Sequence, residues 1–360
     1  MIFRKALLRE LLVVATATFI VLLAITLTTQ LVRLLGQAAT GSITSMAVVA
    51  LLGLSSVNYL PVLLSLTLFI AVLMTLSRSY RDSEMVVWFS SGLSLTEWVW
   101  PVLVFALPLV LVIALLSLTL TPWSVEKSEE LRRQMESRDD VSAISPGAFR
   151  ESRQSERVYF VEDAPDGENM VSNVFASSTQ LGKQGVMVAA RGFQETASNG
   201  DRFLVLLNGR RYEGEPGNAD YKIYQFDRYA MRIDSKEATA ARAPTTKSVS
   251  TMELLSEPVP ANLAELSWRI GLPTSALILA LLAIPLSFVN PRAGRSMNLV
   301  FALLVYMIYS NLLSISQASI AQSRISLLTG LWGVHVLMLV LLLIMFYRRL
   351  MVYSLFRLVR

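Results

Sequence analysis

Residues 57–76 read VNYLPVLLSLTLFIAVLMTL, a run without a single charge. About 20 apolar residues in a helix cross a hydrocarbon core of roughly 30 Å. Of the chain's 360 residues, 53% are hydrophobic and 16% are charged, and the mean hydropathy is +0.51, outside the range of soluble globular proteins. Similar stretches occupy residues 11–32, 99–121, 270–289, 297–321 and 327–347. The sequence therefore predicts a membrane α + β protein with six transmembrane helices.

The basic residues of the short connections predict the orientation, because Lys and Arg accumulate in cytoplasmic loops. On one side they are Arg4, Lys5, Arg9, Arg78, Arg81, Arg292, Arg295, Arg348, Arg349, Arg357 and Arg360. The other side has only Arg33 and Arg324. Both chain ends are thus predicted to be cytoplasmic, and the long polar region between the third and fourth helices is predicted to lie outside. The first apolar stretch lacks a small-residue cleavage site, so it is expected to stay as a helix.

The polar region 123–266 has 18 basic and 23 acidic residues. Residues 123–140 are rich in helix formers, with Glu and Arg three or four apart, and are expected to continue the third helix. Runs of aromatic and β-branched residues follow, separated by turn signals at Asn199-Gly200 and 215–220. The runs are 157–163, 169–178, 185–193, 202–214 and 221–233. They predict an all-β sandwich, barrel or jelly roll inserted into a 3+3 arrangement of helices.

The predicted domains are 1–122, 123–266 and 267–360, which correspond to helices 1–3, the external β-domain and helices 4–6. Two segments have weaker patterns. Residues 42–54 are apolar but too short to span, and we expect them to lie along the outer interface. Residues 234–262 are rich in Ala, Thr, Ser and Pro and are interpreted as a linker.

The sequence lacks the residues that several kinds of catalytic and binding site require. The chain has one histidine, His335, and no cysteine, which argues against Ser/His/Asp and Cys/His catalysis and against zinc sites. His335 is predicted to pack or hydrogen-bond between helices. The stretch LGKQG at 181–185 does not fit a phosphate-binding loop. No carboxylate lies within the predicted spans, so any transport is expected to draw its energy from another subunit.

Polar residues near two helices are candidates for substrate binding. Arg33, with Gln30 one turn before it, lies at the outer end of the first helix. The arginine either snorkels to the headgroups or donates to a phosphate or carboxylate. The fifth helix has the polar residues Tyr306, Ser310, Asn311 and Gln317. These side chains either hydrogen-bond between helices or line a cavity for a partly polar ligand.

The connection between the second and third helices, RSYRDSEMVVWFSSG at 78–92, is too apolar for a plain loop. On a helix, Met85, Trp88 and Phe89 share one stripe, and Arg81 and Glu84 adjoin it. An interfacial helix on the inner leaflet is one interpretation. Because Glu84 gains nothing from anionic lipid, the pattern favours a helix near 80–92 that docks on a soluble ATPase partner.

The run RSYRDSEMVVWFSSGLS at 78–94, the run IPLSFVNPRAGRS at 284–296 and the layout of helices resemble the YjgP/YjgQ family of lipopolysaccharide export permeases. The resemblance covers essentially the whole chain. It implies a Gram-negative inner-membrane complex with the paralogous permease LptG, two copies of the ATPase LptB, and the bitopic protein LptC. Such a complex takes lipopolysaccharide from the membrane and passes it to a periplasmic bridge toward the outer membrane.

The resemblance also implies roles for particular residues. Glu84 matches the glutamate with which the family's coupling helix engages the ATPase, and Arg33 matches a phosphate contact. The first and fifth helices would line the cavity, and the external domain would be a periplasmic jelly roll that joins its edge to LptC. The chain would bind no cofactor, since ATP and Mg²⁺ belong to the ATPase. Separately, the polar region has no basic stretch interleaved with aromatic residues, so nucleic-acid binding is not expected.

Two other classes of protein are alternatives to a transport subunit. A membrane-anchored scaffold would assemble an envelope complex through its periplasmic β-domain without transporting anything. The polar fifth helix argues mildly against it, because polar side chains are energetically unfavourable in a membrane helix and a simple anchor does not need them. A membrane enzyme acting on lipid is disfavoured because the helices lack a convergent His, Cys or acidic set on their outer side.

Overall fold

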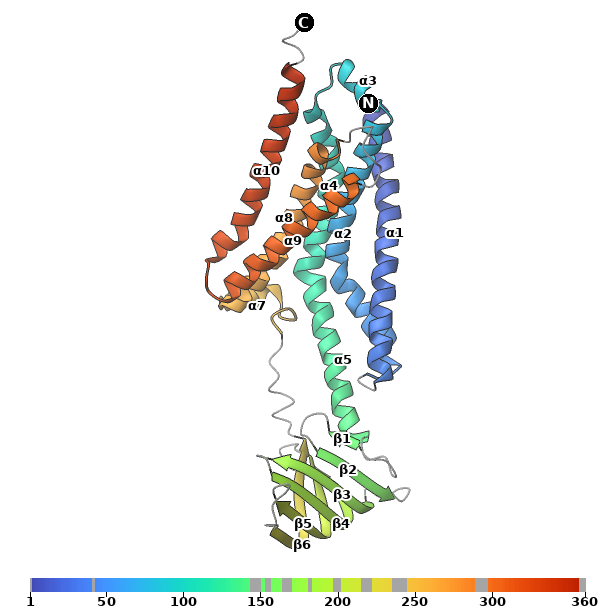
Figure 1. Ribbon diagram of the computed structural model, residues 1–360, viewed down its shortest axis with the longest axis vertical. Coiled ribbons are helices and arrows are strands. Elements are labelled where there is room, and N and C mark those ends of the chain that lie inside the picture. Colours follow the sequence, from blue (N-terminus) through green and yellow to red (C-terminus); the bar gives the residue numbers. More distant parts are fainter. Residues whose placement is uncertain are drawn as a thin grey trace. The chain divides into compact units, whose positions relative to one another are not determined.

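The computed structural model describes residues 2–40, 43–142, 150–152, 157–163, 170–180, 183–196, 202–214, 222–234, 245–288 and 297–355. It divides into two compact units. The helical unit comprises Met1–Glu129 and Pro244–Arg360, and the sheet unit comprises Glu130–Ala243. Figure 1 labels the helices and strands of both.

Within the described residues, six helical spans are long and apolar enough to cross a membrane, as predicted. Three precede the strands in the chain and three follow them. They are α1 (Ile2–Ala39), α2 (Ala47–Arg81), α4 (Val99–Leu115) with its continuation, α8 (Pro260–Leu286), α9 (Met297–Ala321) and α10 (Leu327–Leu355). The continuation of α4 runs through a π-helix, η2 (Leu116–Leu120), into α5 (Thr121–Ser142), so the extension predicted at 123–140 is helical. The short helices are α3 (Glu84–Ser90), η1 (Leu95–Trp98) and α7 (Thr251–Ser256).

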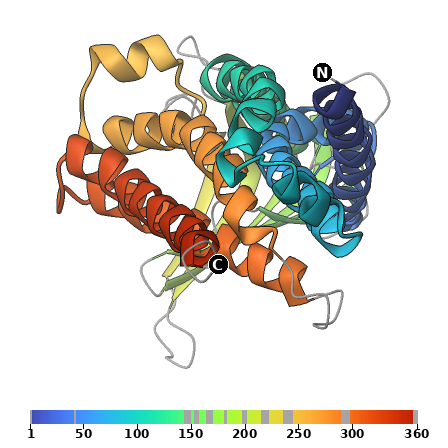
Figure 2. The ribbon, with the colours of Figure 1, turned by 90° about the horizontal axis from the view of Figure 1, so that it is seen from above.

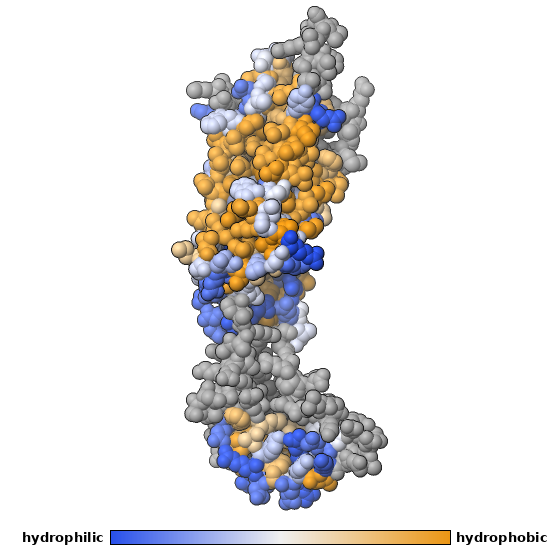
Figure 3. Space-filling model, turned by 90° about the vertical axis from the view of Figure 1, so that its left-hand side faces the viewer, coloured by the Kyte–Doolittle hydropathy of each residue, from blue (hydrophilic) through white to orange (hydrophobic). Residues whose placement is uncertain are grey.

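Two helices, α2 and α8, form the centre of the helical unit. Their apolar side chains make most of the buried core, to which α4 adds Val102, Ala106 and Ile113. Helices α1, α9 and α10 pack around them and keep many apolar side chains exposed (Figures 2 and 3). A helix that is apolar on its outer face suits lipid or an apolar partner.

Two sequence-based boundaries were wrong. Helix α2 begins at Ala47, so most of the apolar run 42–54 forms its first turns, and Pro61 lies inside the helix. Helix α8 begins at Pro260, within the segment interpreted as a linker, and α7 precedes it. The first turns of α8 are polar but buried, and hydropathy alone does not recognise a buried polar turn.

The described strands of the sheet unit form one antiparallel sheet in chain order. They are β1 (Arg150–Ser152), β2 (Arg157–Asp163), β3 (Met170–Gln180), β4 (Lys183–Thr196), β5 (Arg202–Gly214) and β6 (Lys222–Asp234). β2 and β5 match the predicted runs, whereas β1 was not predicted. Asn199-Gly200 and 215–220 lie outside the described residues. Since these strands follow one another in a single sheet, the jelly roll stays a prediction.

One face of the sheet is its apolar core, because side chains alternate across a strand. The core residues are Val171, Val174, Ala176, Met187, Ala189, Leu204, Leu206 and Met231. Gly209 of β5 pairs with Phe226 of β6. A Cβ atom at Gly209 would lie 2.4 Å from Phe226 Cζ and 2.6 Å from the Val188 carbonyl oxygen. The aromatic ring therefore covers a position where only glycine fits.

Candidate functional site

The predicted docking helix exists as α3, but its apolar stripe faces the bundle. Met85 is 1% exposed and belongs to the helical core, against which Trp88 and Phe89 also pack. The outward apolar side chains are Val86 and Val87, 66% and 65% exposed. In the single chain this stripe therefore packs against the protein's own core, and the role of Met85, Trp88 and Phe89 in docking an ATPase stays a prediction. Helical spacing defines a stripe but does not say whether it faces the protein's own core or a partner.

Arg78, near the end of α2, connects α3 to α1 through carboxylates. Its Nη2 donates to Glu10 Oε2 at 2.7 Å, and its Nε donates to the other oxygen of Glu10. Nη1 lies 3.2 Å from Asp82 Oδ2 and 3.3 Å from Glu84 Oε1. Arg81 Nε lies 3.8 Å from Asp82 Oδ1. Acids from three neighbouring elements thus share one guanidinium.

Aromatic contacts tie other helix ends to this cluster. The ring of Tyr80 lies 6.3 Å from that of Phe89 and 5.4 Å from that of Phe288, just after α8. The guanidinium carbon of Arg349 on α10 lies 3.9 Å from the centre of the Phe288 ring. The beginning of α1, the end of α10 and α3 therefore share one end of the helical unit (Figure 1). Residues 289–296, and with them most of the second family motif, lie outside the described ranges.

The predicted substrate residues on α1 are Arg33, which is exposed, and Gln30, which is half-buried. Both lie on the last turns of the helix, toward the end opposite Glu10. Helix α1 packs mainly along α2, while α9 packs mainly along α8 and α10. A cavity shared by α1 and α9 stays a prediction.

The predicted substrate residues on α9 have varied surroundings. Tyr306 is half-buried, and its ring stacks on that of Phe69 at 6.4 Å. Ser310 is half-buried, and Asn311 is exposed and donates to its own helix at the Met307 carbonyl. Gln317 Nε2 lies 3.4 Å from Glu265 Oε2 on α8.

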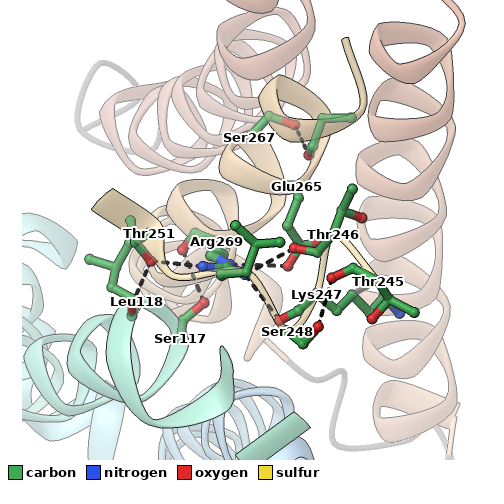
Figure 4. Close-up of polar contacts among 12 residues, drawn as sticks. Ser117, Leu118, Thr245, Thr246, Lys247, Ser248, Thr251, Glu265, Ser267 and Arg269 are labelled. Atoms are coloured by element: carbon green, nitrogen blue, oxygen red, sulfur yellow. Dashed lines mark hydrogen bonds and ion pairs between the residues drawn. The ribbon is translucent and has the colours of Figure 1, made fainter. Parts of the chain in front are cut away.

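A buried ion pair on α8, missed by the sequence analysis, holds the segment 245–251, here called the return segment (Figure 4). Arg269 is 1% exposed, and its Nε donates to Glu265 Oε1 at 3.1 Å. Nη1 donates to Thr251 Oγ1 at 2.8 Å. Nη2 donates to the carbonyls of residues 246, 247 and 249 at 2.9–3.3 Å. All three guanidinium nitrogens of Arg269 thus donate hydrogen bonds, and they fix the backbone that leads into α7.

The return segment is also held by α5 and by the π-helix. Thr245 Oγ1 and Ser248 Oγ donate to the two carboxylate oxygens of Glu129 on α5, at 2.5 and 3.0 Å. Thr251 Oγ1 donates to the Leu118 carbonyl at 2.5 Å. Ser117 Oγ donates to the Arg269 carbonyl at 3.1 Å. Three helical elements therefore meet at one short segment.

The prediction that no carboxylate lies within a spanning helix was wrong. Glu265 lies inside α8, which begins earlier than predicted, and is 5% exposed. Arg269 follows it by four residues, which was the available signal, because Glu and Arg at that spacing share a helix face. Since the carboxylate is paired, its presence supplies no free acid for ion coupling.

His335 packs as predicted. Its Nδ1 lies 2.6 Å from Tyr309 Oη, both residues are buried, and the contact joins α9 to α10.

Apolar helices of spanning length and an inserted antiparallel sheet define a multi-pass membrane protein of the α + β class. The chain belongs to the family described as Lipopolysaccharide export system permease LptF/LptG, whose family model matches residues 5–348. This match confirms the family resemblance.

Individual relatives agree with the family match. The chain is 29% identical over 343 residues to the lipopolysaccharide export system permease protein LptF of Escherichia coli K12. LptF of Escherichia coli O157:H7 and LptF of Shigella flexneri give the same identity. In each case the alignment covers 95% of this chain and 93% of the relative.

Proposed function

We propose that the chain is a permease subunit of an ATP-driven exporter that takes lipopolysaccharide out of the inner membrane and passes it to a periplasmic bridge. The observation that carries this proposal is the family match over residues 5–348, which includes the spanning helices and the inserted sheet. Permeases named for lipopolysaccharide export match over nearly their whole length. The chain is therefore assigned a transport role, and a separate subunit performs the ATP hydrolysis.

The ATPase, an LptB dimer that uses ATP and Mg²⁺, docks in this proposal at α3. Glu84 is partly exposed and is the acid assigned to a cation on the ATPase. The exposed Val86 and Val87 supply the apolar contact, and Arg81 lies exposed nearby. Met85 anchors the helix to the bundle, so that force applied at α3 reaches the permease core.

The membrane topology follows the basic residues. Two sets of three helices cross the inner membrane, both termini and α3 face the cytoplasm, and the sheet unit lies in the periplasm. The common end occupied by α3, the start of α1 and the end of α10 supports this orientation. The paralogous permease LptG completes the membrane part, and LptC adds strands to an edge of a jelly-roll-like domain.

Lipopolysaccharide binds in this proposal between the two permeases. Arg33 donates to a phosphate, and Gln30 lies one turn before it. The candidates on α9 are Tyr306, Ser310, Asn311 and Gln317. Of these, Gln317 also contacts Glu265 on α8. Their partial exposure in the single chain supports a lining role once the second permease is present.

Co-purification in mild detergent tests the proposal against the alternatives. We expect recovery of an ATPase, a second permease of similar size and bound glycolipid. Recovery of periplasmic proteins alone, with neither ATPase nor glycolipid, would instead support a scaffold. Turnover of a lipid by the isolated chain would support an enzyme.

A further inference from the structure

The Arg78 cluster holds its three acids unequally. Glu10 receives two hydrogen bonds from the guanidinium, at Nε and Nη2, in a paired, side-by-side geometry. Glu84 lies at 3.3 Å from Nη1 and 3.4 Å from Nη2, near the outer limit of a hydrogen bond. The side chain of Glu84 is 41% exposed, against 26% for Glu10. Glu84 is therefore held less firmly than Glu10, as is Asp82, whose side chain is 46% exposed and lies 3.2 Å from Nη1.

The local charge favours transfer of Glu84 from Arg78 to a cation on a partner. Among the described contacts of this cluster, the three carboxylates of Glu10, Asp82 and Glu84 face two guanidinium groups, those of Arg78 and of Arg81, which lies 3.8 Å from Asp82. A cation brought by a partner would find an acidic surplus here. When Glu84 turns to that cation, Arg78 keeps both bonds to Glu10, so no charge is left unpaired.

We propose that the Glu10–Arg78 pair is a holding pair that sets how readily Glu84 is offered to a cationic docking partner. Glu10 and Arg78 act as positioning residues, because they reach the partner only through Glu84. The inference rests on the proposed docking of an ATPase at Glu84. It adds that the start of α1, through Glu10, competes with that docking site for Arg78.

The competition makes two substitutions act in opposite directions. Glu10→Gln removes the stronger partner of Arg78, which then holds Glu84 more tightly and weakens docking. Arg78→Gln releases Glu84 into an acidic surplus and strengthens docking. A general disturbance of this end of the bundle would weaken docking in both variants.

The test titrates purified LptB-type ATPase onto the complete permease pair in lipid nanodiscs. For partly exposed ion pairs we expect affinity to fall about two- to fivefold in Glu10→Gln and to rise by a similar factor in Arg78→Gln. Glu97→Gln is the matched control, because Glu97 is an exposed acid on η1 outside the cluster, and its affinity should not change.

Repeating both substitutions in a Glu84→Gln background separates the two claims. If Glu84→Gln alone leaves affinity unchanged, the proposed docking role fails. If Glu84→Gln weakens docking but the other two variants shift affinity in the same direction, or not at all, the holding pair is overturned. Loss of both shifts in the Glu84→Gln background supports it, and their persistence there overturns it.

Discussion

Replacing Arg269 by methionine should destabilise the helical unit strongly. The substitution keeps much of the side-chain volume but removes a guanidinium that is 1% exposed and bound to Glu265, Thr251 and three backbone carbonyls. Glu265 would remain as a buried charge, and among the described residues its remaining hydrogen-bond partner would be Gln317, at 3.4 Å. Removing one partner of a buried ion pair typically costs about 3–5 kcal/mol. At roughly 2–4 °C per kcal/mol, the Tm should fall by on the order of 10 °C.

The assay is thermal unfolding of the purified full chain in mild detergent, followed by tryptophan fluorescence. Arg324→Met is the matched control, because Arg324 is exposed between α9 and α10, and such a change is expected to stay within about 0.5 kcal/mol. The double variant Arg269→Met/Glu265→Leu should recover most of the loss, since it leaves no buried charge unpaired. A single variant as stable as the control, or a double variant no better than the single, would refute the role assigned to the pair.

Three further substitutions test separate parts of the structure. Gly209→Ala should destabilise the sheet by about 1–3 kcal/mol, because its Cβ would overlap the Phe226 ring. Gly36→Ala is the control, because a Cβ atom there would meet no atom within 4 Å. Urea-dependent proteolysis of the full chain measures both variants, and equal resistance would contradict the packing at Gly209. Tyr309→Phe removes the hydroxyl bonded to the histidine of α10 and should cost about 1–3 kcal/mol, and an unshifted Tm would argue against that bond. Arg33→Glu should reduce photocrosslinking to lipopolysaccharide by placing like charge near phosphate, and unchanged crosslinking would reject the contact.

The sequence predicts the elements better than it predicts their partners. Strands such as Arg157–Asp163 and Arg202–Gly214 match their predicted runs, because turn residues and β-branched residues mark both ends. The spans were found because uncharged runs of that length are rare in soluble chains. Boundaries failed at Ala47 and Pro260, where an apolar helix extends beyond one bilayer thickness or begins with buried polar turns.

For the candidate site, too, the sequence predicts the local helix but not its long-range contacts. The location of α3 follows from its pattern, but the side on which Met85 lies depends on packing against distant core residues. The connection of Arg269 to the return segment joins carbonyls 20 to 23 positions away, to which no local pattern points. Long-range polar contacts of this kind become visible only in three dimensions.

The most direct test of the transport role is ATP-dependent release of lipopolysaccharide from vesicles that contain the assembled complex. With Glu84→Ala, release should fall several-fold although the permease is expressed and inserted normally, while Glu97→Ala should release lipopolysaccharide at the unmodified rate. Release by Glu84→Ala at the rate of the unmodified complex would contradict the claim that ATP hydrolysis reaches this permease through α3.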